Sequence, residues 1–98
     1  MNAITRQSLQ DVVIRVLNDT VRDWDLEIEG GINASTTLIE GLAFESIDIV
    51  QFSVALEQAL GRKDLPFERL FIDEGNYVDD VSVADITAFL ADAMQAAA

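Results

Sequence analysis

Hydrophobic residues recur at helical spacing near both ends of the chain. The first run predicts an amphipathic helix of about five turns, with apolar positions at Leu9, Val12, Val13, Val16, Leu17 and Val21. Near the other end, Ser82 and Asp85 resemble a capping box, in which a serine caps the helix and the acid three residues later bonds back. The helix predicted after Ser82 has its apolar positions at Val83, Ile86, Phe89, Leu90, Ala93 and Met94.

The central part of the chain predicts a second long helix, from near Ser46 to Gly61, because glycine suits the position after the last helical residue. At roughly 100° per residue its apolar side chains fall into two groups. The broader face holds Ile49, Phe52, Leu56, Ala59 and Leu60, and the narrower stripe holds Ile47, Val50 and Val54. A helix in a small bundle needs one buried face. The narrower stripe is therefore either a second core contact of a central helix or an exposed surface.

A short third helix is predicted from Asp64-Leu65-Pro66, with the aspartate as cap and the proline in the first turn. Its apolar anchors are Phe67, Leu70 and Phe71. Glycines 30 and 31 open a loop that reaches to about Phe44, and the alternating segment 24–29 is too isolated to form a sheet. These elements predict an all-α fold of one domain over residues 1–98, a four-helix bundle with a long loop between its first two helices.

The chain is strongly acidic, with a formal net charge of −12. Residues 23–50 carry seven acidic residues and no basic residue. Nucleic acids and anionic membranes repel such a chain, whereas partners with basic docking surfaces attract it. No apolar run approaches the length of a membrane span, and the first residues lack the layout of a signal peptide. We therefore expect a cytoplasmic protein, without membrane insertion, that is monomeric.

The residue types that most enzymes and metal sites need are missing. The chain has no cysteine and no histidine, which excludes thiolate nucleophiles, Ser–His pairs and the usual zinc sites. The alternating acids Asp23, Asp25, Glu27 and Glu29 suggest a calcium loop. This hypothesis fails the EF-hand pattern, because Ile28 stands at the glycine position and Ala34 at the position of the bidentate glutamate. The sequence therefore predicts a protein that is not an enzyme and holds no metal.

Ser46 is the most informative candidate residue, because it follows Glu45 at the start of the long acidic helix. Serine before an apolar run is usually an N-cap. The first turn of a helix also has unpaired N–H groups that favour negative charge. A phosphodiester formed on the Ser46 hydroxyl would meet this favourable end of the helix.

The segment around Ser46 resembles the acyl carrier protein family, whose Asp-Ser-Leu motif carries 4′-phosphopantetheine on its serine. Ser46 matches the modified serine, Ile47 the following leucine and Asp48 the next acid. Further matches to the family are Leu38, Ile39, Glu40, Leu42, Val50, Ala55, Leu56 and Glu57. The order of the predicted helices is also similar to that of the family, so the resemblance covers nearly the whole chain.

The resemblance implies a carrier of acyl intermediates, held as thioesters on an arm that a phosphopantetheinyl transferase attaches to Ser46. Such carriers serve fatty-acid, lipid or polyketide-type synthesis. The expected partners are acyl-loading, condensing or acyltransferase enzymes with basic docking surfaces. The residues expected to contact them are Glu45, Asp48 and Glu57, which supply charge, and Ile47 and Val54, which supply apolar contact.

The chain also departs from the family pattern. Glu45 replaces the usual aspartate, Phe44 stands where most relatives have a small residue, and Gln51 replaces a recognised glutamate. The segment of residues 70–80 is longer than the corresponding segment in minimal members of the family. These changes predict a specialised carrier. Two other interpretations stay open: an acidic four-helix adaptor that binds a basic partner without covalent modification, and, less in keeping with the composition, a small enzyme.

Overall fold

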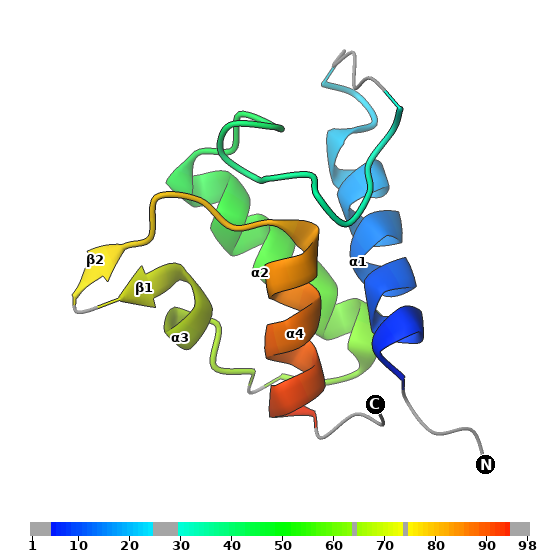
Figure 1. The fold of residues 1–98 in the computed structure, drawn as a ribbon, viewed down its shortest axis with the longest axis vertical. Helices are drawn as coiled ribbons and strands as arrows, with labels where there is room; N and C mark the ends of the chain where they lie inside the picture. The colour runs from blue at the N-terminus through cyan, green and yellow to red at the C-terminus, as the bar shows by residue number, and fades with distance from the viewer. Residues whose placement is uncertain (1–4, 25–29, 64, 74, 95–98) are drawn as a thin grey trace.

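The described residues form four α-helices and one two-stranded hairpin (Figure 1). The structure is a computed structural model and describes residues 5–24, 30–63, 65–73 and 75–94. The helices are α1 (Arg6–Val21), α2 (Ser46–Leu60), α3 (Glu68–Phe71) and α4 (Val83–Ala93). The strands β1 (Ile72–Asp73) and β2 (Asn76–Tyr77) pair antiparallel between α3 and α4. The fold is therefore mostly helical, as the sequence predicts.

Helix α1 packs against both α2 and α4, while α3 and the hairpin lie on the other side of the molecule (Figure 1). The core between the long helices is apolar, and the long loop also contributes to it through Leu38, Leu42 and Phe44. Phe44 contacts Phe52 of α2 edge-on, with ring centroids 6.0 Å apart, and Trp24 at 5.2 Å. The long loop thus forms part of the core and is fixed against the start of α2.

The predicted helix boundaries follow from local capping. The Thr5 hydroxyl accepts a hydrogen bond from the N–H of Ser8 (3.1 Å) at the start of α1. The capping box predicted at α4 is confirmed, because the Ser82 hydroxyl accepts from the N–H of Asp85 at 3.1 Å. Helix α2 ends at Gly61, whose φ of 68° is the left-handed conformation that glycine adopts without strain.

The segment between α2 and α4 differs from its prediction. Helix α3 begins at Glu68, and the N–H of Arg69 bonds to the carbonyl of Pro66 at 3.0 Å, so the proline lies in a turn before the helix. Asp64, the predicted cap, lies outside the described residues, as do residues 25–29 of the alternating segment. The hairpin was not predicted, because strands of two residues are too short to show an alternating pattern.

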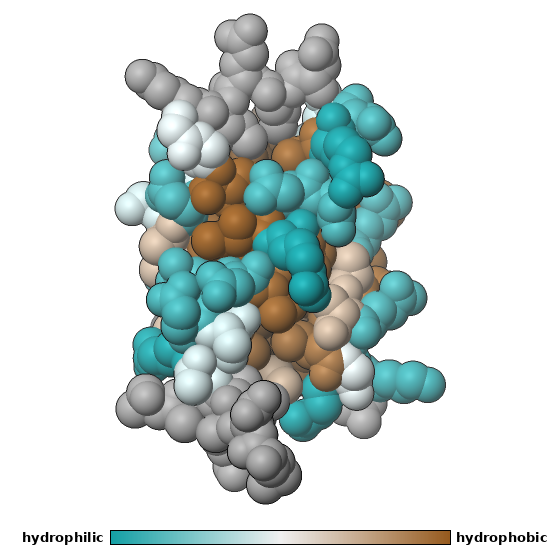
Figure 2. Space-filling model, turned by 90° about the vertical axis from the view of Figure 1, so that its right-hand side faces the viewer, coloured by the Kyte–Doolittle hydropathy of each residue, from teal (hydrophilic) through white to brown (hydrophobic). Residues whose placement is uncertain are grey.

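The narrower apolar stripe of α2 is an exposed surface rather than a second core contact. Ile47, Val50 and Val54 are 57%, 55% and 47% exposed, whereas Ile49, Phe52 and Leu56 on the broader face are buried. On the side of the molecule where α1 lies, apolar surface also shows between hydrophilic side chains (Figure 2).

Within the part of the chain that the structure describes, no helix combines the length and the apolar character needed to cross a membrane.

Candidate functional site

Ser46 is the first residue of α2, and Glu45 is the residue that precedes the helix as its N-cap. The interpretation of Ser46 as an N-cap is therefore wrong. The carboxylate of Asp48 accepts a hydrogen bond from the N–H of Glu45 at 2.8 Å, so an acid three residues into the helix satisfies the capping position. The Ser46 side chain is exposed, and no other described residue forms a hydrogen bond with its hydroxyl. This hydroxyl is accessible to a modifying enzyme.

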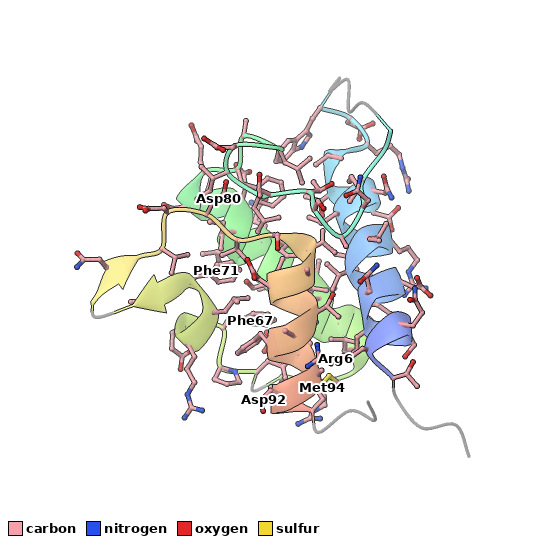
Figure 3. The ribbon with its side chains drawn as sticks, viewed as in Figure 1. Arg6, Phe67, Phe71, Asp80, Asp92 and Met94 are labelled. Carbon is pink, nitrogen blue, oxygen red and sulfur yellow. The ribbon has the colours of Figure 1, made fainter. Side chains whose placement is uncertain are left out.

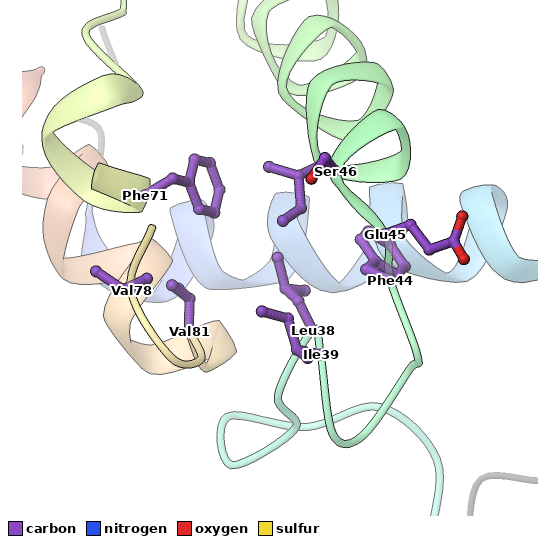
Figure 4. Close-up of a pocket in the computed structure, with 9 residues that line it drawn as sticks. Leu38, Ile39, Phe44, Glu45, Ser46, Phe71, Val78 and Val81 are labelled. Atoms are coloured by element: carbon purple, nitrogen blue, oxygen red, sulfur yellow. The ribbon is translucent and has the colours of Figure 1, made fainter. Parts of the chain in front are cut away.

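An apolar cavity of about 300 Å³ opens beside Ser46 (Figure 4). Its walls come from the long loop, the start of α2, the end of α3 and the segment before α4. The lining residues are Leu38, Ile39, Phe44, Glu45, Ser46, Ile49, Phe71, Val78 and Val81. Figure 4 shows the Phe71 ring facing Ser46 across the cavity, and the Glu45 carboxylate pointing away from it. An apolar group attached near Ser46 would find a water-excluding surface within reach.

Asp80 joins two walls of this cavity. Its carboxylate accepts hydrogen bonds from the N–H groups of Ile39 (2.9 Å), Glu40 (3.0 Å) and Val81 (2.8 Å). Burial raises the pKa of the Asp80 carboxyl. The hydrogen bonds from these three N–H groups and from the Thr37 side chain lower it by more, so its pKa lies below the ordinary value of 3.8.

Backbone bonds extend the same contact. The N–H of Leu38 donates to the carbonyl of Val81, and the N–H of Val83 donates to the carbonyl of Thr36, both at 2.9 Å. Asp80 lies above Phe67 and Phe71 in the view of Figure 3. The long loop is therefore attached to the start of α4 at the level of the cavity.

A second, more open groove of about 230 Å³ lies between α2 and the α3–β1 segment. It is lined by Ser46, Ile49, Val50, Ser53, Val54, Phe67, Glu68, Phe71 and Ile72. Ser46, Ile49 and Phe71 line both the groove and the cavity. Ser46 thus stands at the junction of two apolar hollows.

The structure brings four of the six predicted site residues together. Glu45, Ser46, Ile47 and Asp48 are consecutive at the start of α2, with Asp48 half-buried and the other three exposed. Val54 and Glu57 lie farther along the same helix. Glu57 is eleven residues from Ser46, about 16 Å along the helix axis, and its carboxylate accepts a hydrogen bond from the N–H of Leu65 at 3.2 Å. Glu57 therefore also has a structural role, because it binds the segment that leads to α3.

Sequence reasoning missed the residues that form the far walls of the cavity. Val78 and Val81 flank two aspartates between the third and fourth helices, where no periodic pattern assigns them to a face. Of the four acidic residues considered for calcium, Asp23 alone lies among the described residues. Across the described ranges, no group of three or more acidic side chains is arranged to hold a metal ion.

Comparison of the chain with models of protein families, with curated proteins and with solved structures finds no match. The function of the site is therefore inferred from its own residues and geometry.

The excess of acidic residues between positions 30 and 60 should make stability depend on salt. Between residues 30 and 60 the chain carries Glu40, Glu45, Asp48 and Glu57 and no basic residue. Like charges on a small domain repel one another, and salt screens that repulsion. We expect the melting temperature at pH 7 to rise as sodium chloride increases from 20 to 300 mM. Sucrose stabilises by exclusion from the protein surface and does not screen charge, so it controls for effects of added solute other than screening. A melting temperature independent of sodium chloride would contradict this account.

Proposed function

We propose that this protein is an acyl carrier whose Ser46 bears a 4′-phosphopantetheine arm. The observation that carries the proposal is the position of one exposed serine hydroxyl, at the start of a long helix and at the mouth of an apolar cavity. The resemblance of residues 35–60 to acyl carrier proteins supports the same assignment. The protein is a substrate and partner of other enzymes in this proposal, and performs no catalysis itself.

The first turn of α2 suits the attachment chemistry. A phosphopantetheinyl transferase would join the Ser46 oxygen to the phosphorus of the pantetheine phosphate of coenzyme A, and 3′,5′-ADP would leave. The resulting phosphodiester is an anion next to unpaired backbone N–H groups, which stabilise negative charge. The carboxylate of Asp48 already accepts a hydrogen bond from the N–H of Glu45. This bond holds the Asp48 carboxylate at the capping position.

The composition of the chain explains why an arm is needed. The chain has no cysteine, so a thioester requires a thiol from outside, which the arm supplies at its end. The acyl group on this thiol is apolar along most of its length. The cavity beside Ser46 is lined mainly by aliphatic and aromatic side chains. An acyl group that enters it would be stabilised by roughly 25 cal/mol for each Å² of apolar surface removed from water.

Partner enzymes would approach the exposed face of α2 near Ser46. Glu45 and Asp48 supply negative charge beside the attachment site, and the exposed Ile47 and Val54 supply apolar contact. Charge complementarity of this kind accelerates encounter and sets orientation more than it raises affinity. A carrier needs these properties, because it must leave each enzyme after transfer.

The second candidate function is an acidic adaptor that binds a basic partner without modification. The exposed stripe of Ile47, Val50 and Val54 supports it, because an apolar surface with acidic neighbours can bind a protein whether or not Ser46 is modified. The adaptor gives no role to the cavity at Ser46.

One experiment separates these functions. The purified protein is incubated with coenzyme A, Mg²⁺ and a broad-specificity phosphopantetheinyl transferase, and its intact mass is measured before and after. A carrier gains the mass of one phosphopantetheinyl group, unless it is purified already bearing it, in which case the first spectrum shows the added mass. A mass equal to that of the bare chain in both spectra would refute the carrier and leave the adaptor.

A further inference from the structure

The cavity beside Ser46 has an exposed mouth and a buried interior. Ile39, Glu45 and Ser46 are exposed and stand at the mouth. The interior is closed by buried apolar side chains, which are Leu38, Phe44, Ile49, Phe71 and Val81. None of the lining residues is basic, and the carboxylate of Glu45 points away from the cavity (Figure 4). The interior therefore suits an apolar group and offers no partner to a negatively charged one.

Phe44 closes the cavity on the side of the core. Its ring contacts Trp24 and Phe52, with centroids 5.2 and 6.0 Å away, and neither of these two residues lines the cavity. Further apolar core therefore lies behind Phe44. Phe71, on the opposite side of the cavity (Figure 4), instead separates it from the open groove. A smaller side chain at position 44 would lengthen the cavity inward, whereas a smaller one at position 71 would join it to the groove.

The backbone around Phe44 holds this wall in place. The N–H of Phe44 donates to the carbonyl of Leu38 at 2.9 Å, and the N–H of Ala43 donates to the carbonyl of Ile39 at 3.0 Å. Ala43 has a φ of 58°, in the left-handed region that is unfavourable for residues other than glycine. Such a conformation persists only where the surrounding contacts fix it. The Phe44 ring is thus not free to move aside for a longer occupant.

The volume of the cavity limits the size of what it encloses. An apolar cavity of about 150 Å³ holds one benzene molecule, which has about six carbon atoms' worth of space. By this measure the cavity of about 300 Å³ holds roughly a dozen non-hydrogen atoms. With about four of these taken by a thioester and the adjoining carbons of an arm, about eight remain for an acyl chain.

We propose that Phe44 limits the acyl group that this protein encloses to about eight carbon atoms, so that its cargo is a short, apolar acyl chain. Longer chains stay partly in water, because the Phe44 ring and the core behind it leave them no space. The inference rests on the proposed function in identifying the occupant as an acyl group on the arm. The length limit is a property of the cavity and exists without the arm.

Free S-acyl pantetheines test the length limit with the unmodified protein. The probes carry butanoyl, hexanoyl, octanoyl, decanoyl and dodecanoyl groups, and dissociation constants are obtained from amide and methyl chemical shifts of the isotope-labelled protein. Each methylene that leaves water should tighten binding about four-fold. We expect this gain from the butanoyl to the octanoyl probe, and a change of less than about two-fold between the decanoyl and dodecanoyl probes.

Two matched variants assign the limit to Phe44. Phe44→Leu should extend the longest chain that still gains affinity by about two to three carbon atoms, because leucine has a side chain about three carbons smaller. Phe89→Leu is the control. It makes the same exchange at a half-buried ring that contacts Phe67, at 5.5 Å between centroids, and does not line the cavity. This variant should keep the limit of the unaltered protein.

A measurement on the unaltered protein does not depend on the folding of any variant. Intermolecular nuclear Overhauser contacts should join the terminal methyl group of bound octanoyl pantetheine to the ring of Phe44. The same methyl group should show no contact with Val50 or Val54, which line the groove and not the cavity.

Four results would overturn the proposal. These are no binding of the octanoyl probe, an affinity that keeps rising to the dodecanoyl probe in the unaltered protein, the same limit in Phe44→Leu as in the unaltered protein, or methyl contacts confined to the groove. Failure of Ser46 to accept the arm would refute the carrier function, yet would leave the limit measured with the free probes unchanged.

Discussion

Replacing Ser46 by alanine should abolish attachment of the phosphopantetheine arm completely and leave the fold unchanged. The Ser46 hydroxyl is the proposed point of attachment, so its removal leaves no oxygen to form the phosphodiester. Its side chain is exposed at the first position of α2 and forms no hydrogen bond with another described residue. We therefore expect the free energy of unfolding to change by less than about 0.5 kcal/mol. Intact mass after treatment with the transferase, together with thermal unfolding followed by circular dichroism, measures both effects.

Ser53→Ala is the matched control for this variant. Ser53 lies on the same helix and lines the groove, but its hydroxyl donates to the carbonyl of Ile49 at 2.8 Å and the side chain is half-buried. This variant should gain the arm as the unaltered protein does. Labelling of the Ser46→Ala variant, or loss of labelling in Ser53→Ala with Ser46 intact, would show that the attachment site is assigned to the wrong serine.

Replacing Asp80 by alanine should produce a large loss of stability without touching the attachment site. The substitution removes three hydrogen bonds to backbone N–H groups, from Ile39, Glu40 and Val81. Water can reach part of this partly exposed site, so we expect a loss of about 2 kcal/mol in the free energy of unfolding at pH 7, below the sum of three charge-assisted bonds. Asp79→Ala is the control, because it removes the same charge from an exposed neighbouring residue. Urea unfolding of the three proteins gives the comparison.

The effect of Asp80 should disappear in acid. The pKa of its carboxyl is lower in the folded protein than its ordinary value of 3.8, so the folded state favours the ionised form. Its contribution is fully present above the unfolded pKa and is lost as pH falls through the folded pKa. The difference in unfolding free energy between the unaltered protein and Asp80→Asn should therefore be largest at neutral pH and shrink below about pH 4. A difference of constant size from pH 7 to pH 3 would contradict the assigned role of this carboxylate.

The three longest helices could be predicted because their signals are local. Helical periodicity indicates α1 and α4. The Ser82–Asp85 capping box marks the start of α4, and Gly61 marks the end of α2. The sequence places the start of α2 near Ser46, and a serine before an apolar run is usually the N-cap. In the structure Glu45 is the N-cap, its N–H donates to the carboxylate of Asp48, and Ser46 is the first helical residue. Local pattern was sufficient for these elements, since each is fixed by residues within one or two turns.

The remaining parts of the site depend on contacts between distant segments. Asp80 bonds to Ile39, 41 residues earlier in the chain, and Phe71 faces Ser46 across the cavity. Neither contact follows from a repeating pattern, so the cavity could not be predicted. The exposed stripe of α2 was likewise undecided in the sequence. Whether Val50 and Val54 are covered depends on where α3 and the hairpin lie, and no periodic pattern in the sequence indicates the hairpin.

The most direct test of the central claim is to locate the added mass within the protein. The unaltered protein is incubated with coenzyme A and the transferase, digested, and its fragments are sequenced by tandem mass spectrometry. The account predicts one phosphopantetheinyl group on the fragment that contains Ser46, with fragment ions that assign it to this serine, and none on fragments that contain Ser8, Ser35, Ser53 or Ser82. An unmodified Ser46 fragment, or the group on any other residue, would contradict it.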